Sequence, residues 1–132
     1  MREILFRGKS EKFENWIEGS LIVGRDLESG QLEYLIAPLS AYYTEVKKVV
    51  PETVGQYTGL TDKNGKKIFE GDILKFSYNE KDENPIFYSI EWKSDRACFG
   101  YAETADKMIE VDCLHCEVIG NIHDNIELLG GE

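Results

Sequence analysis

Residues 54–74 have the sequence VGQYTGLTDKNGKKIFEGDIL and predict a strand, a tight turn and a second strand. Asn64-Gly65 suits a two-residue type I′ turn, because both central residues of that turn need a positive φ and these two residues adopt it at the least cost. Tyr57 precedes the turn and Ile68 and Phe69 follow it, so aromatic and β-branched residues flank it on both sides. The sequence therefore predicts a β-hairpin.

A second break follows the hairpin at Glu70-Gly71-Asp72, and residues 73–78 then begin a new strand. Glycine at a sharp bend between two strands is a common means of closing small barrels. We therefore expect the chain to turn a corner at Gly71, and the hairpin to form part of a compact barrel.

The rest of the chain has the pattern of short strands separated by turns. Gly19 suggests a bulge or bend in its strand. The segment 39–50 is expected to be irregular and to lead into a strand, because the residue before Pro51 avoids the α region. A turn of helix at 125–129, with leucines that cap the core, is the one helical element expected. The remaining strands are predicted at residues 4–7, 16–23, 32–36, 86–92, 98–101, 108–111 and 117–123. The predicted fold class is all-β, with one or more small barrels and little helix.

The composition is that of a soluble globular protein. The chain has 132 residues, the size of one domain, and no repeat or linker divides it. Apolar residues make up 42% and charged residues 30%, which distinguishes it from a disordered chain. No apolar run approaches the ~18 residues of a membrane span, and the N-terminal residues lack the apolar core of a signal peptide. We therefore expect a cytoplasmic protein.

The three cysteines are Cys98, Cys113 and Cys116, an odd number that is unusual for a secreted disulfide scaffold, so we expect them to be reduced. Cys113 and Cys116 have the spacing that zinc sites use, and His115 and His123 are candidate further ligands. A strand would send Cys113 and His115 to one face and Cys116 to the other, and no second cysteine pair is present. The sequence favours buried or half-buried thiols over a metal site, and no cofactor is expected.

The net charge of −10 is unevenly spread, because residues 61–132 carry 16 acidic and 8 basic side chains. Such a field repels nucleic acid, whose binding depends on lysine and arginine contacts to phosphate. The acidic residues form either a solvated face or a surface for a basic partner. Lys47-Lys48 and the lysines of residues 63–67 could touch nucleic acid locally, but they are also typical of a strand edge and a hairpin tip, where lysine discourages edge pairing.

Several blocks of this sequence resemble, in order and spacing, the YopX family of phage and prophage proteins. They are Phe6-Arg7-Gly8-Lys9 with Trp16 and Gly19, residues 53–60, Asp62-Lys63-Asn64-Gly65, residues 68–73 and residues 118–125. The resemblance covers almost the whole chain and implies a single YopX-like domain, residues 1–132, of β-rich fold. It also implies an SH3-like barrel in the central to C-terminal part, with subdomains at 1–53 and 54–132 as a possible division. It implies no catalytic residues, because the family has none agreed.

Candidate site residues are few. Glu70 and Asp72 lie two residues apart beside a glycine and could present paired carboxylates to a metal or to a proton transfer. Alternatively, Asp72 accepts hydrogen bonds from backbone N–H groups and holds the corner. Tyr57, Asn64 and Trp92 are further candidate binding residues, although aromatic residues in strands usually pack in the core or in cross-strand pairs.

The sequence thus predicts a non-catalytic module that binds another protein, a phage or host partner with a basic surface. Small barrels offer sheet edges and loop-lined grooves for that use, and an acidic surface suits a basic partner. An accessory protein of nucleic-acid metabolism is the alternative, and an enzyme that uses Glu70 and Asp72 is the third. Unpaired strand edges also allow a homo-oligomer, and no membrane partner is expected.

Overall fold

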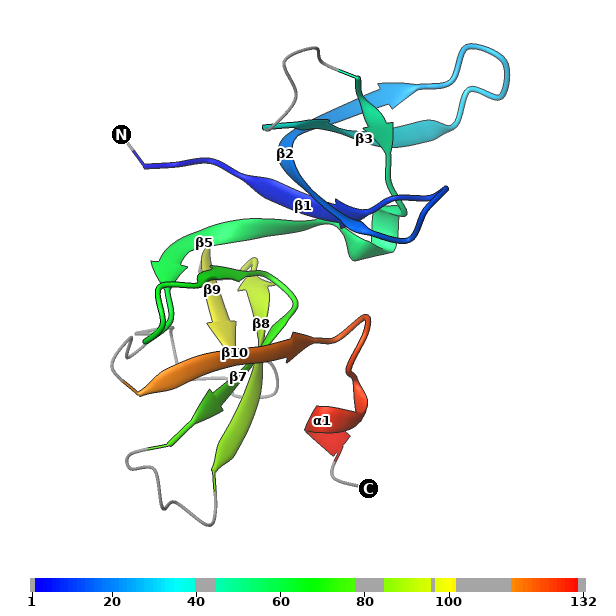
Figure 1. Ribbon diagram of the computed structural model, residues 1–132. Coiled ribbons are helices and arrows are strands. Elements are labelled where there is room, and N and C mark those ends of the chain that lie inside the picture. The colour runs from blue at the N-terminus through cyan, green and yellow to red at the C-terminus, as the bar shows by residue number, and fades with distance from the viewer. Residues whose placement is uncertain (1, 40–44, 78–84, 96, 102–114, 131–132) are drawn as a thin grey trace. The chain divides into compact units, whose positions relative to one another are not determined.

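The computed structural model describes residues 2–39, 45–77, 85–95, 97–101 and 115–130. Within these ranges the chain is almost entirely β-structure, as predicted (Figure 1). The strands are β1 (Phe6–Lys9), β2 (Trp16–Arg25), β3 (Leu32–Pro38), β4 (Lys47–Lys48), β5 (Gly55–Thr61), β6 (Lys67–Phe69), β7 (Asp72–Phe76), β8 (Ile86–Lys93), β9 (Cys98–Tyr101) and β10 (Cys116–Asn121). A 3-10 helix, η1 (Pro51–Thr53), and a short helix, α1 (Glu127–Gly130), complete the described elements.

The chain divides into two compact units, Met1–Tyr57 (unit 1) and Thr58–Glu132 (unit 2). The division falls inside β5, which contributes its first residues to one unit and its later residues to the other. The predictions of a single domain, of a subdomain boundary at 53/54 and of an SH3-like barrel stay predictions.

The sheet of unit 1 closes on itself. β1 pairs with β2, β2 with β3 and β3 with β4, all antiparallel, while the start of β5 pairs with the other edge of β1. Just beyond β1, Ser10 forms a bridge with Val49, and Val50 N–H donates to the Lys9 carbonyl at 2.9 Å. The segment after β4 is therefore hydrogen-bonded to the segment after β1, which gives unit 1 a barrel-like closure. The sequence predicts a compact barrel around the hairpin of residues 54–74 and not this closure.

The interior of unit 1 is small and closely packed at Gly8. Its buried cluster consists of Ile17, Ile36 and Val49, and Ile36 has no exposed surface. Gly8 lies against this cluster, because a Cβ there would stand 3.0 Å from Val49 Cβ and 3.3 Å from Ile36 Cδ1. Thr53 fastens η1 to β1, since its Oγ1 donates to the Val50 carbonyl at 2.6 Å and accepts from Lys9 N–H at 2.9 Å.

Of the bulge or bend that the sequence suggests at Gly19, the bulge is absent, and the bend stays a prediction. Gly19 pairs in continuous register with Phe6 on one side and with Pro38 on the other. The glycine serves a close backbone approach, because a Cβ at this position would lie 1.9 Å from the Ala37 carbonyl oxygen.

The predicted hairpin of residues 54–74 is present, but the type I′ turn is not. Gly65 N–H donates to the Asp62 carbonyl at 3.0 Å, and Asp62 N–H donates to the Lys66 carbonyl at 2.8 Å. Gly65 has a φ of 80°, whereas Asn64 keeps a negative φ. This is a three-residue loop, a β-turn followed by one left-handed residue. The Asp62 side chain explains the difference, because its Oδ1 accepts from Asn64 N–H and Lys66 N–H, each at 2.9 Å.

The corner at Gly71 is confirmed. Gly71 has a φ of 91°, its N–H donates to the Ile90 carbonyl at 2.7 Å, and its carbonyl accepts from Ile122 N–H at 2.9 Å. The chain then enters a four-stranded antiparallel sheet in the order β10-β7-β8-β9. The register between β10 and β7 shifts between Val118 and Gly120, so a bulge lies in β10.

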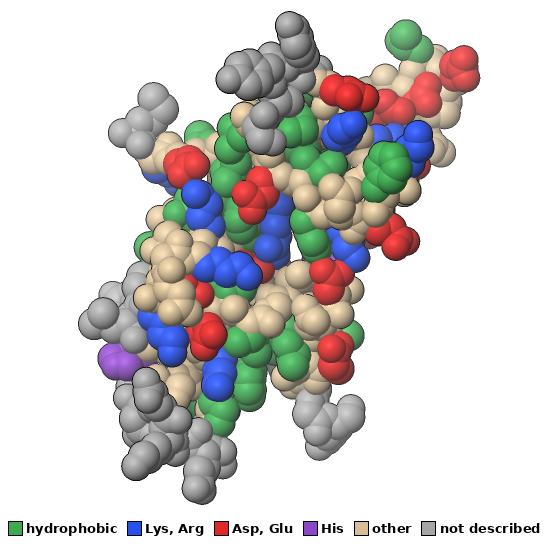
Figure 2. Space-filling model, viewed as in Figure 1, with side chains coloured by type: hydrophobic (Ala, Val, Ile, Leu, Met, Phe, Trp, Pro, Cys, Tyr) green, Lys and Arg blue, Asp and Glu red, His purple; other side chains and the backbone are tan. Residues whose placement is uncertain are grey.

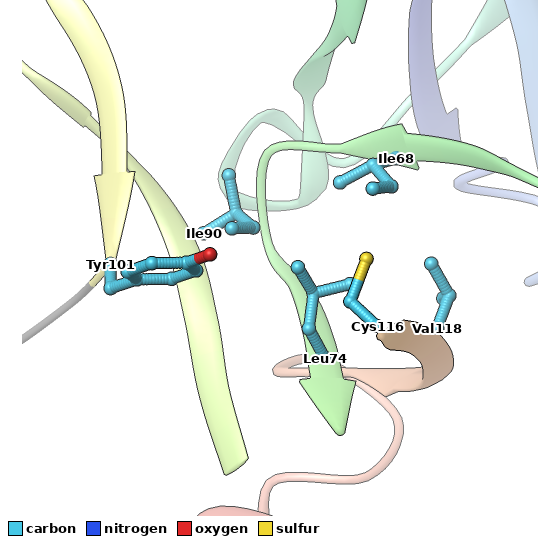
Figure 3. Close-up of a cluster of buried hydrophobic side chains, with 6 residues drawn as sticks. All are labelled: Ile68, Leu74, Ile90, Tyr101, Cys116 and Val118. Atoms are coloured by element: carbon cyan, nitrogen blue, oxygen red, sulfur yellow. The ribbon is translucent and has the colours of Figure 1, made fainter. Parts of the chain in front are cut away.

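The core of unit 2 forms between this sheet and β6. Figure 3 shows its buried side chains pointing toward one another from β6, β7, β8, β9 and β10. Three aromatic rings extend it, because Tyr101 lies 5.6 Å from Phe76 and 4.9 Å from Tyr88 between ring centroids. The buried set is Ile68, Leu74, Ile90, Tyr101, Cys116 and Val118.

Most remaining strand predictions that fall on described residues are confirmed to within a few residues, and the predicted strand 108–111 lies outside the described residues. The helical turn near the C-terminus is also confirmed. Its leucines do not both cap a core, because Leu129 is 37% exposed. In the part of the chain that is described, no helix has both the length and the apolar character needed to cross a membrane.

The substitution Gly19→Ala tests the close approach of β2 and β3. Because its Cβ would overlap the Ala37 carbonyl, we expect the free energy of unfolding to fall by about 2 kcal/mol or more. Urea denaturation measures the change. Gly24→Ala is the control on the same strand, where a Cβ meets nothing within 4 Å, and it should stay within about 1 kcal/mol of wild type. Equal effects of the two substitutions would contradict the interpretation.

Candidate functional site

Two adjoining recesses lie in unit 1, between the β1–β2 connection and the segments that flank β3 and β4. The larger has a volume of about 660 Å³ and the smaller about 470 Å³, and Lys47 lines both. The larger is lined by Ser10, Glu11, Lys12, Phe13, Glu45, Val46, Lys47 and Lys48, and the smaller by Asn15, Trp16, Ile17, Glu18, Pro38, Leu39 and Lys47. We call the two together the recess pair.

Local hydrogen bonds explain why one wall of the recess pair projects an aromatic ring. Ser10 N–H donates to the Asn15 carbonyl at 2.8 Å, and Ser10 Oγ accepts from Phe13 N–H at 3.2 Å. Glu14 takes a left-handed φ of 61° to complete this tight connection. The backbone of this connection is held by its own hydrogen bonds, and the Phe13 side chain is 68% exposed. Lys12 Nζ lies 5.3 Å from the centroid of the Phe13 ring.

The opposite wall combines apolar and charged side chains. Val46 is 38% exposed and Leu39 is 66% exposed. Lys48 Nζ lies 3.7 Å from a Glu11 carboxylate oxygen, and Lys47 Nζ lies 3.4 Å from one of Glu45. Exposed pairs of this kind contribute about 0–1 kcal/mol each, so these lysines can exchange partners at little cost.

Trp16 lines the smaller recess, and its ring lies beside two cations. The Arg7 guanidinium carbon lies 4.7 Å from the centroid of the Trp16 ring, and Lys9 Nζ lies 5.8 Å from it. Arg7 and Lys9 stand beside Glu18 and Trp16 across the β1–β2 ladder. The face visible in Figure 2 intersperses acidic, basic and apolar side chains and shows no large area of one charge.

Of the predicted carboxylate pair, Asp72 is hydrogen-bonded to the backbone. Asp72 is 1% exposed, and its Oδ2 accepts from Phe69 N–H at 2.7 Å, which holds the corner before β7. Glu70 is half-buried in that corner. Neither residue lines the recess pair.

The other candidate binding residues have separate settings. Tyr57 is buried at 8% exposure, and Asn64 lies in the hairpin loop, where its N–H donates to Asp62. Trp92 is 46% exposed and packs edge-on against Phe99 at 5.1 Å between centroids. None of the three lines the recess pair. Its most exposed apolar residue is Phe13, which sequence reasoning missed. The available signal was an aromatic residue inside an otherwise charged connection.

The candidate metal ligands are not brought together among the described residues. Cys116 is fully buried in the core of unit 2, and Cys113 lies outside the described residues. His115 stands in the turn before β10, and His123 N–H donates to Asn121 Oδ1 at 2.9 Å. Where the chain is described, no group of three or more His, Cys, Asp or Glu side chains could hold a metal ion.

Asp62 is a buried carboxylate whose importance the sequence did not reveal. Besides the two N–H groups of its own loop, it accepts through Oδ2 from Val118 N–H at 2.9 Å, across 56 positions of sequence. The side chain therefore ties the hairpin to β10. An aspartate at the start of a turn predicts the local bonds but not the distant one.

Side chains of residues 120–125 also stabilise a turn by hydrogen bonds to the backbone. Asn121 Oδ1 accepts from the N–H groups of His123 and Asp124, both at 2.9 Å. Asn125 Oδ1 accepts from Asn121 N–H at 3.3 Å, and a Cβ on Gly120 would lie 2.5 Å from that oxygen. These asparagines shape the turn after β10.

One exposed carboxyl has a shifted pKa. In the β2–β3 connection, Glu28 N–H donates to Asp26 Oδ1 at 2.8 Å, and this bond lowers the pKa of Asp26 below its ordinary value. Asp26 therefore stays ionised in mildly acidic solution.

Comparison with known proteins adds a family and a fold. The family model described as YopX protein matches residues 5–130. The structure is similar to the crystal structure of protein EF1440 from Enterococcus faecalis, with a TM-score of 0.62 and 24% identity over 98% of this chain and 99% of that chain. No curated protein matches.

Substitution Asp62→Ala tests the tie between the hairpin and β10. It removes the acceptor of three backbone N–H groups, one of them in a buried strand, so we expect the free energy of unfolding to fall by about 3 kcal/mol. Asp95→Ala makes the same chemical change at an exposed turn and should stay within about 0.5 kcal/mol of wild type. Chemical denaturation measures both, and a small effect at Asp62 would show that the bonds are dispensable.

Proposed function

The chain belongs to the YopX family, and we propose that it is a non-catalytic protein-binding module that acts on a phage or host partner in the cytoplasm. The observation that carries this proposal is the recess pair of unit 1, which exposes Phe13, Leu39 and Val46 around a concave surface.

A concave surface with exposed apolar side chains suits a polypeptide ligand. Ordering a Phe or Leu side chain costs less free energy in lost side-chain entropy than a partner gains by covering its apolar area. Such side chains therefore act as anchors in interfaces. Phe13 at 68% exposure and Leu39 at 66% offer most of that area. The recess volumes are in the range that accommodates one or two partner side chains.

The charged rim of the recess pair favours a protein partner with its own charged side chains. Lys12, Lys47 and Lys48 alternate with Glu11 and Glu45, so a partner that carries both signs can replace the loose ion pairs of the rim. The acidic excess of residues 61–132 supports a partner whose surface is basic overall, since opposite net charge steers association.

The non-catalytic part of the proposal is supported by the settings of two buried carboxylates, of which Asp72 is one of the two candidates that the sequence nominated. Asp72 holds a corner with almost no exposed surface, and Asp62 accepts three backbone N–H groups. A carboxylate in general acid or base catalysis must reach its substrate, and these two are committed to the backbone.

A nucleic-acid accessory role is the second candidate, and Trp16 favours it. An aromatic ring flanked by Arg7 and Lys9 is typical of surfaces that stack bases beside phosphate contacts. The net charge of −10 opposes this role, because most of the affinity for nucleic acid comes from neutralised phosphates.

Affinity capture from the lysate of a phage-bearing host tests the proposal. Tagged wild-type protein and the variant Phe13→Ser are used as baits, with and without nuclease, and the retained proteins are quantified by mass spectrometry. We expect a partner that survives nuclease treatment and is retained at least about tenfold less by Phe13→Ser, because an anchor at an interface centre contributes 1.4 kcal/mol or more.

Leu27→Ser is the matched control, since Leu27 is fully exposed in the β2–β3 connection and lies outside the recess pair. Both variants should retain the circular dichroism spectrum and melting temperature of wild type. Equal loss with both variants, or no loss with either, would contradict a role of the recess pair. Partners that disappear with nuclease would favour the nucleic-acid role.

A further inference from the structure

β2 extends beyond β1, the strand that pairs with one of its two edges. β1 pairs with β2 from Trp16 to Gly19, whereas β3 pairs with it from Gly19 to Arg25. Residues 20–25 therefore have a strand neighbour on one side, and no described strand pairs with them on the other. Figure 1 shows β2 and β3 running together toward their connecting turn, away from β1.

The backbone groups on that outer edge can be assigned from two hydrogen bonds. Leu39 N–H donates to the Glu18 carbonyl at 3.3 Å, and Asp26 N–H donates to the Gln31 carbonyl at 2.9 Å. Even-numbered residues of β2 thus point their backbone groups toward β3, and alternation points those of Leu21, Val23 and Arg25 outward.

The side chains beside this edge are apolar and exposed. Ile22 is 43% exposed and Val23 is 50% exposed, and Leu32 on β3, opposite Arg25, is 51% exposed. Natural edge strands usually carry lysine, proline or a bulge that prevents pairing, and residues 20–24 (SLIVG) have none of these. As far as the described residues show, this edge is therefore open to a further strand.

We propose that a second copy of this chain occupies the edge, with the two β2 strands antiparallel about a two-fold axis at Val23. In this register Val23 faces Val23 of the second copy, and Leu21 faces its Arg25. All outward-pointing groups then meet partners, since three hydrogen-bonded pairs exchange about six hydrogen bonds.

The strand is self-complementary in charge and shape, which favours a second copy over a foreign strand. Arg25 meets Leu21, Asp26 meets Ser20, and Ile22 meets Gly24, so no residue of 20–26 meets a like charge. The pairing covers Ile22 on one face of the ribbon and Val23 on the other. An isologous contact of this kind closes as a dimer and does not propagate.

Substitution Val23→Lys tests this dimer, because it places two like charges together on the axis. We expect purified wild-type protein to elute with twice the 15.1 kDa chain mass by light scattering, and Val23→Lys to give the chain mass. Leu27→Lys makes the same charge change in the adjoining turn, outside residues 20–26, and should remain dimeric. A wild-type protein that is monomeric at every accessible concentration, or a dimer that survives Val23→Lys, would overturn the proposal.

Disulfide trapping fixes the register and remains decisive if Val23→Lys fails to fold. Val23→Cys brings two thiols together on the axis, where facing Cα atoms stand about 5.5 Å apart, within disulfide range. Ile22→Cys on the same edge leaves its two Cα atoms offset by two residues, about 8 Å apart and beyond that range. Mild oxidation should yield a covalent dimer of Val23→Cys at least tenfold above Ile22→Cys and wild type. Equal trapping of the two variants would refute the register.

Discussion

Unit 2 depends on one buried carboxylate. Asp62 is 4% exposed and accepts three backbone N–H groups, two from its own loop and one from β10. A charge taken out of water is tolerated only where hydrogen bonds replace its hydration, so this side chain specifies both the turn and the position of the closing strand. The buried cluster of unit 2, which includes Ile68 and Val118, packs beside the hairpin and the strand that Asp62 joins.

The blocks that carry the family resemblance are largely the ones that the fold uses. Gly19 admits a close backbone approach, Gly71 supplies a left-handed corner, and Asp72 and Asn121 hold turns. This explains why membership of the YopX family, and likeness to a structure with 24% identity, define an architecture more clearly than an activity. Residues that the backbone conformation requires do not indicate which molecules the surface binds.

The proposed interaction surfaces lie on segments that make few contacts with the rest of unit 1. Phe13 is held only through the hydrogen bonds of a tight connection, and residues 20–25 extend beyond the strand that covers the start of β2. A protein partner at the recess pair and a second copy at the β2 edge use different parts of unit 1. A test of one proposal therefore does not decide the other.

The sequence alone determined the all-β class, most of the strands, the hairpin and the corner at Gly71, because alternation of apolar residues and the conformational freedom of glycine are local properties. The turn type was decided by local hydrogen bonds of the Asp62 side chain that the Asn64-Gly65 pattern does not reveal. The role of Gly19 and the reach of Asp62 to Val118 were decided by contacts between segments distant in sequence. The same holds for the candidate site, since Phe13 and Val46 share a recess only because the segment after β1 bonds to the segment after β4. Local patterns do not encode which strands meet, and only the closed sheet brings these side chains together.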